Sequence, residues 1–128
     1  MLLDSAVAYA MSDVDMVLLG ADVVTETGGV VGAMGTYQVA LVARAMSKPV
    51  YVAAESYKFA RLYPLGQKDI EQGAGRAVDF GGVPVLVGVD VEAAARDYTP
   101  PQHLELFITD LGVLPPPAVG DLLLELSM

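Results

Sequence analysis

Residues 20–41, GADVVTETGGVVGAMGTYQVAL, constrain the fold of this chain most, because a strand, a glycine-rich turn and a helix follow one another there. The strand is expected over residues 16–20, whose continuous apolar run is typical of a strand buried on both faces. The helix is expected to begin near Gly35. This order is typical of α/β proteins, which bind ligands outside the carboxyl ends of their strands. We therefore expect a pocket rim along residues 22–36.

Two further segments belong to the same expected sheet and its cover. Residues 50–54, VYVAA, are β-branched and aromatic and predict a second central strand. The helix over residues 35–46 is apolar nearly all round, which predicts that it is heavily buried. Residues 1–3 read as the end of a strand, and Asp4 or Ser5 can cap the helix that follows. A chain that opens in this way is expected to be the C-terminal portion of a larger protein.

The second half of the chain alternates between loop-like and regular patterns. Five glycines among polar residues over 66–82 predict a flexible loop, and residues 83–91, VPVLVGVDV, predict an edge strand because Pro84 lacks a backbone donor. Capping-box spacing from Thr99 predicts a helix with one apolar stripe, ended by Gly112. A last helix is expected after the prolines at 115–117. The two helical stripes are Leu104, Phe107, Ile108 and Leu111, then Val119, Leu122, Leu123 and Leu126.

Composition narrows the classes of function. The chain has 128 residues, enough for one domain, and 54% of them are hydrophobic, which is more than a small soluble core needs and favours a protein partner. A net charge of −9 with scattered basic residues argues against nucleic acid, and no apolar run has the 18 or so residues of a membrane helix. With no cysteine and no recognisable secretory leader, the chain is expected to be cytoplasmic.

A metal centre is not expected from the residue types present. Thiolate sites are excluded by the lack of cysteine, and a single histidine, His103, cannot form a histidine cluster. We expect His103 to be a partly exposed helix residue with no catalytic role.

The glycine-rich turn over residues 28–35 offers two interpretations. Its spacing matches neither a dinucleotide-binding fingerprint nor a P-loop, and no basic residue lies between Asp22 and Arg44. Backbone amides and the helix N-terminus could still bind an anion. The alternative is a flexible turn that lets the helix approach the sheet closely.

Two carboxylates and a group of aromatic residues complete the candidates. Asp22 and Glu55 both follow strands, so they are expected at the same edge of the sheet, most simply as partners of amides or of a cation such as Lys58 or Arg61. Much of the aromatic content lies in the run around Tyr57. These rings suit either a core or an interface centre. They are Tyr51, Tyr57, Phe59, Tyr63 and Phe80.

Three stretches resemble the alpha-type subunits of the translation initiation factor 2B family: residues 20–41, residues 54–69, AESYKFARLYPLGQKD, and residues 97–114, DYTPPQHLELFITDLGVL. These runs are more similar to alpha than to beta or delta subunits. The family also includes isomerases of methylthioribose 1-phosphate and ribose 1,5-bisphosphate. The resemblance implies a Rossmann-like three-layer α/β sandwich with a mostly parallel sheet, here residues 1–128 as a single domain, preceded in the family by a helical domain.

The isomerase pattern is not complete in this chain. Isomerases of the family read Asn-Gly-Asp and then Asn-Lys before Gly-Thr, with a catalytic Asp, whereas this chain has Thr27-Gly28-Gly29 and Gly32-Ala33. A glycine cannot shuttle a proton, and the cysteine of the family is absent too. The resemblance therefore implies no catalytic residue. Alpha subunits commonly keep Asn at the positions of Thr27 and Gly32, so this chain also departs from them.

The first hypothesis is a non-catalytic regulatory subunit of the guanine nucleotide exchange complex for initiation factor 2. The resemblance implies a homodimer, contacts with other initiation factor 2B subunits, and sensing of phosphorylated initiation factor 2. The alternatives are a sugar-phosphate isomerase descendant and an orphan binding domain that stays monomeric.

The candidate residues fall into two sets. A vestigial pocket for a sugar phosphate or nucleotide, with no other cofactor and no metal, is expected at Asp22, Gly28, Gly29, Gly35, Thr36, Glu55 and Lys58. Interface candidates are Tyr57, Phe59, Arg61, Tyr63, Phe107 and Leu111, with the two expected C-terminal helices.

Overall fold

The computed structural model describes residues 1–72 and 80–126 and contains a mostly parallel sheet, as predicted. Its strands run in the order β1-β4-β6-β7, and only β7 is antiparallel to its neighbour. The predicted strands at 16–20 and 50–54 are confirmed as β1 and β4, which pair in parallel from Val17 opposite Val50. The bounds are β1 Val17–Leu19, β4 Val50–Ala53, β6 Leu106–Thr109 and β7 Gly112–Leu114.

A second, antiparallel sheet was not predicted. Its strands β2 (Val23–Val24), β3 (Val30–Ala33) and β5 (Arg96–Thr99) run in the order β2-β3-β5. β2 and β3 form a hairpin whose turn holds the two adjacent glycines, and β5 joins β3 from far along the chain. Half of the glycine-rich turn expected over residues 28–35 is therefore strand, namely β3.

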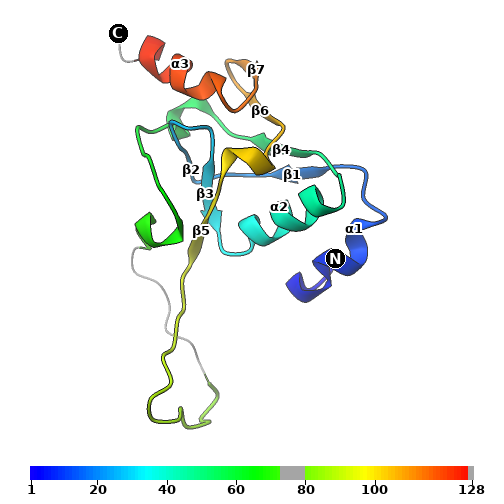
Figure 1. Ribbon diagram of the computed structural model, residues 1–128, viewed down its shortest axis with the longest axis vertical. Helices are drawn as coiled ribbons and strands as arrows, with labels where there is room; N and C mark the ends of the chain where they lie inside the picture. Colours follow the sequence, from blue (N-terminus) through cyan, green and yellow to red (C-terminus); the bar gives the residue numbers. More distant parts are fainter. Residues whose placement is uncertain (73–79, 127–128) are drawn as a thin grey trace.

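Helices cover the parallel sheet and its ends (Figure 1). The predicted helix over 35–46 is confirmed as α2, which contacts α1, β1, β4 and β5, and the predicted last helix is confirmed as α3. Residues 1–3 are exposed coil and not the strand that was expected. The bounds are η1 Asp4–Ala6, α1 Val7–Met11, α2 Thr36–Ala45, η2 Ser56–Lys58, η3 Gln67–Asp69, η4 Pro101–His103 and α3 Ala118–Leu126.

One hydrophobic cluster joins both sheets and all three α-helices. Val24 and Val30 enter it from the antiparallel sheet, and Val52 and Phe107 from the parallel sheet, all four fully buried. The prediction that α2 is heavily buried was wrong, since only Ala40 and Ala43 of this helix are buried. A helix at the surface of a small domain needs only one apolar stripe against the core, and the other apolar side chains of α2 remain accessible.

The predicted helix over residues 99–111 is wrong. Pro100 is extended, a short 3-10 turn follows, and residues 106–109 form β6, which pairs with β4 through Phe107 opposite Val52. The apolar spacing at 104, 107, 108 and 111 fits a helix, but Ile108 and Leu111 are exposed while Leu104 and Phe107 are buried. The backbone N–H and C=O groups of β4 that face β6 need hydrogen-bond partners. Pairing with β4 therefore makes residues 106–109 a strand despite their helical spacing.

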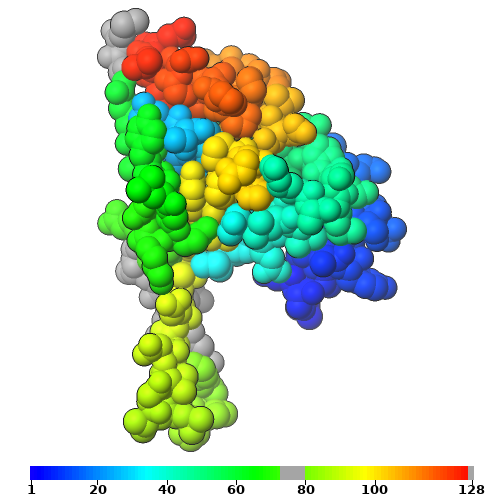
Figure 2. Space-filling model, in the orientation of Figure 1, coloured from blue at the N-terminus to red at the C-terminus, as the bar shows by residue number. Residues whose placement is uncertain are grey.

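The predicted strand over residues 83–91 is also wrong. Residues 80–95, called the arm below, form no strand and are all exposed, and they project from the body of the protein (Figures 1 and 2). A strand needs a neighbour that satisfies its backbone donors and acceptors, and no described strand pairs with residues 83–91. At the base of the arm, the carbonyl oxygen of Ala95 accepts a hydrogen bond from the N–H of Met34. The predicted flexible loop over 66–82 begins with η3, and its residues 73–79 lie outside the described residues.

β1 is less buried than its sequence suggested. It lies at the end of the strand order, and Leu18 keeps 59% of its surface exposed, so the expectation of burial on both faces was wrong. In the part of the chain that the structure describes, no helix has the length and apolar character to cross a bilayer.

Candidate functional site

The N-terminus of α2, the expected anion site, is capped by a carboxylate of the chain itself. Oδ2 of Asp97 accepts hydrogen bonds from the backbone N–H groups of Gly35, at 2.9 Å, and Tyr37, at 3.1 Å. Asp97 lies in β5 and is only 5% exposed. It stabilises the positive end of the helix dipole in the way that a bound anion would. These two amides are therefore not free for a phosphate.

The amides of the glycine turn are also in use. Gly29 donates its N–H to Oγ1 of Thr25 at 3.0 Å, and Gly28 donates to the carbonyl oxygen of Thr25. Gly28 has φ +91°, a conformation that side-chain-bearing residues rarely adopt, so the turn needs glycine there. Hydrogen bonds within the β2–β3 hairpin therefore hold this turn. The prediction of ligand binding at Gly28, Gly29, Gly35 and Thr36 stays a prediction.

Gly29 has no room for a side chain. A Cβ atom built on it would lie 2.7 Å from the carbonyl oxygen of Thr99 and 2.7 Å from both Cε1 and the hydroxyl oxygen of Tyr98. A Cβ atom built on Gly28 would likewise lie too close to the main chain of Pro116. The place where related isomerases are expected to carry an Asp is thus filled by β5 and the C-terminal segment.

The predicted carboxylates have different surroundings. Asp22 follows β1 and forms an ion pair with Arg96 of β5 at 3.4 Å, a partner that was not predicted. Glu55 follows β4, at the same edge of the parallel sheet, and is exposed. Lys58 lies over the ring of Tyr57, with Nζ 5.9 Å from its centroid. Thr36 donates its hydroxyl to the carbonyl oxygen of Ala33 at 2.7 Å.

Two glutamines, which the sequence analysis did not single out, complete the outer edge of β5. Oε1 of Gln67 accepts from the N–H of Tyr98 at 2.8 Å, and its Nε2 donates to the carbonyl oxygen of Tyr98 at 2.7 Å. Gln72 makes the same pair of bonds to the N–H and carbonyl oxygen of Arg96, each 2.9 Å. Since residues 96 and 98 face the same side of β5, the two side-chain amides take the place of a neighbouring strand.

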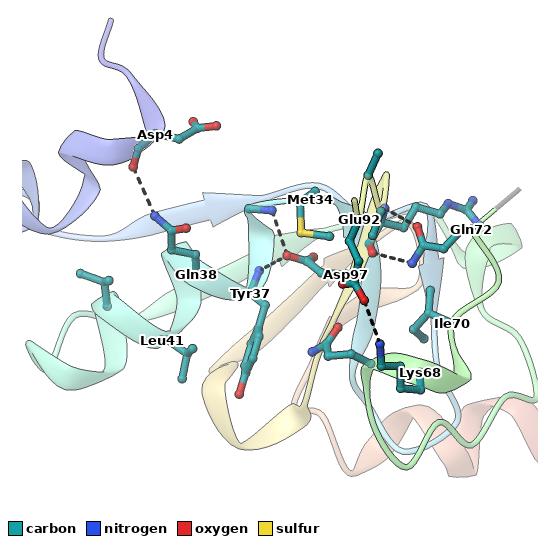
Figure 3. A pocket seen from close by; sticks show the side chains of 16 residues that line it. Asp4, Met34, Tyr37, Gln38, Leu41, Lys68, Ile70, Gln72, Glu92 and Asp97 are labelled. Carbon is teal, nitrogen blue, oxygen red and sulfur yellow. Dashed lines mark hydrogen bonds and ion pairs between the residues drawn. The ribbon is translucent and has the colours of Figure 1, made fainter. Parts of the chain in front are cut away.

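A cavity of about 1020 Å³ opens beside the start of α2, between the helix, the segment with the two glutamines and the base of the arm (Figure 3). Its basic side chains are both paired, Lys68 with Glu92 at 3.5 Å and Arg96 with Asp22. The cavity therefore offers little free positive charge to a phosphate. Apolar lining comes mainly from Met34, Tyr37, Leu41, Val42, Ile70 and Ala93. Among the residues that the structure describes, no acidic or histidine cluster could hold a metal ion.

The interface candidates divide into exposed and buried residues. Tyr57 and Tyr63 are 74% and 63% exposed, and Arg61 and Leu111 are exposed as well. Phe59 and Phe107 belong to the hydrophobic core, so the prediction that they form an interface is corrected. Phe59 bridges to Val24 of β2, and Phe107 lies in a central strand, where apolar burial stabilises each ring within this chain.

His103 lies in η4 and not in the longer helix that was expected. Its ring packs edge-on against Tyr37, with centroids 5.6 Å apart. Burial, and next the positive charge of Arg44, lower the pKa of His103 below its ordinary value. Asp110 lies at the other end of β6, where hydrogen bonds from the backbone N–H and the hydroxyl of Ser56 lower the pKa of its carboxyl group.

The chain is similar in sequence to known proteins of one family. The family profile described as "Initiation factor 2 subunit family" matches residues 1–116. The chain is 43% identical over 136 residues to "Translation initiation factor eIF2B subunit alpha" of Dictyostelium discoideum, covering 98% of this chain and 42% of that protein. It is 38% identical over 117 residues to the ribose 1,5-bisphosphate isomerase of Archaeoglobus fulgidus, covering 91% of this chain and 37% of that protein.

A solved structure extends the similarity to three dimensions. The crystal structure of 5-methylthioribose 1-phosphate isomerase from Pyrococcus horikoshii matches with a TM-score of 0.77 and 30% identity, over 98% of this chain and 37% of that one. The chain thus spans about two fifths of the length of the curated relatives it matches. Because the profile covers most of the sequence and the fold agrees, the chain belongs to the Initiation factor 2 subunit family.

Proposed function

We propose that the chain is part of a non-catalytic regulatory subunit of the guanine nucleotide exchange complex for translation initiation factor 2. In this role it acts in the cytoplasm, forms a homodimer, assembles with other initiation factor 2B subunits and helps to sense phosphorylated initiation factor 2. The observation that carries the proposal is the 43% identity to an eIF2B alpha subunit over 98% of the chain.

The geometry around Gly29 supports a role without catalysis. A proton-transferring carboxylate at this position has no space, because Tyr98 and Thr99 fill it. The amides that could hold a phosphate nearby are bonded to Asp97 and Thr25. Recognition of other proteins, by contrast, needs only exposed side chains, and Tyr57 and Tyr63 supply such rings.

Native mass spectrometry of the full-length protein, alone and with the other subunits of the exchange complex, tests the proposal. We expect a homodimer that enters a larger assembly of fixed stoichiometry. A protein that remains outside the assembly at concentrations where an eIF2B alpha subunit enters it contradicts the proposal. Binding of the assembly to initiation factor 2, with and without phosphate on that factor, then tests the sensing role.

The second candidate is an isomerase descendant that binds or converts a ribose phosphate, favoured by the 38% identity to a ribose 1,5-bisphosphate isomerase. Phosphorus NMR of the full-length protein with ribose 1,5-bisphosphate, and separately with 5-methylthioribose 1-phosphate, decides this point. We expect both substrates to remain unchanged. Turnover of either one would replace the regulatory proposal with an enzymatic one.

A further inference from the structure

The arm carries a strand pattern that finds no partner within the described chain. Valine occupies every second position from Val83 to Val91, so an extended backbone places five valines on one face and Pro84, Leu86, Gly88, Asp90 and Glu92 on the other. This is the period of a half-buried strand, and β-branched residues favour that conformation. Yet every residue from 80 to 95 is exposed.

The exposure of the arm is large for a folded protein. Val87 is 104% exposed, Leu86 77% and Val83 66%. Figure 2 shows the arm projecting beyond the body, and at its base Glu92, Ala93 and Ala94 line the cavity beside α2. Residues 86–89 form a turn in which Val89 donates its N–H to the carbonyl oxygen of Leu86 and Gly88 has φ +85°. Strand addition opens this turn, which is possible because glycine adopts an extended conformation without steric cost.

The total surface is also larger than a compact monomer of this size has. The chain exposes 8371 Å². A compact protein of 13.4 kDa exposes about 6,500 Å², which leaves an excess of roughly 1,900 Å². A standard protein interface buries about 800 Å² on each partner. The excess is therefore sufficient for a specific interface that includes the arm.

Charge distinguishes the kinds of partner. The arm has two carboxylates, Asp90 and Glu92, and no basic residue between positions 80 and 95. A second copy of this chain offers the edge strands β1 and β7. β1 lies between Asp15 and Asp22 in the sequence, β7 follows Asp110, and the whole chain has a net charge of −9. Pairing the arm with those edges brings like charges together, whereas a basic surface attracts it.

We propose that residues 83–91 add as a β-strand to the free sheet edge of a partner protein that has an apolar face flanked by basic residues. The valine face packs on the partner, and Asp90 lies against its basic side chains. Glu92 joins it there when its exposed ion pair with Lys68 opens. Backbone hydrogen bonds give the pairing its affinity, and alternate side chains give it specificity. This inference deepens the proposed function and rests on it, because the partner is taken to be another subunit of the exchange complex.

Two variants at one fully exposed position test strand addition in the full-length protein. Val87→Pro removes a backbone donor and restricts the backbone, while the matched control Val87→Ala trims the side chain and keeps the N–H group. Native mass spectrometry with the partner subunits measures assembly. We expect Val87→Pro to weaken association about tenfold or more, the equivalent of at least one lost backbone hydrogen bond, and Val87→Ala to weaken it clearly less.

Hydrogen exchange supplies a second readout. In the assembly, alternate backbone amides between 83 and 91 are expected to be protected, and in the free protein they are not. If wild type and Val87→Pro assemble equally well, strand addition is wrong while the regulatory proposal stands. Equal weakening by both variants indicates side-chain docking and also overturns strand addition.

Two further outcomes overturn the inference in other ways. Self-association of the purified protein that Val87→Pro abolishes identifies a second copy as the occupant. A wild-type protein that does not join the other subunits at all removes the proposed function together with the inference that rests on it.

Discussion

Asp97 and Asp22 are carboxylates at the same rim with different roles. Asp97 is buried and holds two amides of α2, whereas Asp22 is largely exposed and pairs with Arg96. A buried cap satisfies donors that water cannot reach, while an exposed ion pair competes with water and salt. The two residues are therefore expected to differ in their contribution to stability.

Asp97→Ala is expected to lower the free energy of unfolding by about 1–2 kcal/mol, because two helix N–H groups lose their acceptor. Asp22→Ala is the matched control and is expected to cost less than about 1 kcal/mol. Urea denaturation followed by circular dichroism measures both. Equal effects of the two substitutions would show that the cap contributes no more than the surface ion pair.

Gly29 is packed closely against β5. Gly29→Asp introduces the acid that the family resemblance implies for isomerases, but it places a Cβ atom 2.7 Å from Thr99 and Tyr98. We expect a loss of about 3 kcal/mol or more, from overpacking and a buried charge, and no isomerase activity. Thermal unfolding and a substrate assay measure these effects. Gly20→Asp is the control, because no atom lies within 4 Å of its added Cβ.

His103 makes stability depend on pH. Its folded-state pKa lies below its ordinary value near 6.5, so the unfolded chain takes up the proton first as pH falls. The stabilising contribution of neutral His103 is complete above about pH 6.5, and it decreases as the pH falls below that value. His103→Gln should therefore show a smaller loss of melting temperature between about pH 7 and pH 5. Identical pH profiles of variant and wild type would contradict this role.

At the level of elements, the outer edge of β5 is completed by side chains and not by a strand. Gln67 and Gln72 bond to alternate residues of β5, and this contact holds their segment against the antiparallel sheet. The edge is thereby protected from pairing with another chain.

Gln67→Met keeps the length of the side chain but leaves the N–H and C=O groups of buried Tyr98 without their partners. We expect the free energy of unfolding to fall by about 2–3 kcal/mol. Gln38→Met, which loses only an exposed 3.3 Å hydrogen bond from Nε2 to the carbonyl oxygen of Asp4, serves as the control and should change stability by less than about 0.5 kcal/mol. Chemical denaturation compares the two, and a similar result for both would show that water replaces the glutamine bonds.

The elements that were predicted correctly have one property in common. Each has an apolar pattern and a glycine or a proline at one boundary: β1 at Gly20, β4 at Pro49, α2 at Gly35 and α3 at Pro117. The segment over 104–111 fits a helical stripe as well as it fits a buried strand. Local spacing cannot distinguish a helix from a strand here. The backbone N–H and C=O groups on one side of β4 need partners, and pairing with them favours the strand.

For the molecule as a whole, the arm determines the shape. A compact chain of 128 residues has a radius of gyration of about 14 Å. With the arm extended, small-angle X-ray scattering of the monomer should give a value above about 14 Å. Binding of the partner proposed above should not fold the arm back onto its own body. A measured radius equal to the compact value would indicate that the arm packs on this chain.

The candidate site was predictable only in part. Asp22, Gly28, Gly29 and Gly35 follow from the strand–turn–helix order and from the family resemblance. The structure places Gly28 and Gly29 in the turn before β3 and Gly35 after it, at the start of α2, so these glycines lie at opposite ends of β3. Asp97, Arg96 and the two glutamines were not assigned roles, since they act from positions 24 to 74 residues away from the groups they contact. Nothing in local spacing marks such a pair.

The sequence by itself determined the α/β class, the strands β1 and β4, and the helices α2 and α3. These features depend on residue type and short-range period. Only the tertiary structure decided that residues 96–109 form two strands and that the start of α2 is capped by Asp97. It also decided that the valines of the arm stay unpaired. Each of these outcomes depends on which backbone groups lack a partner once the chain is folded, and a linear pattern does not contain that information.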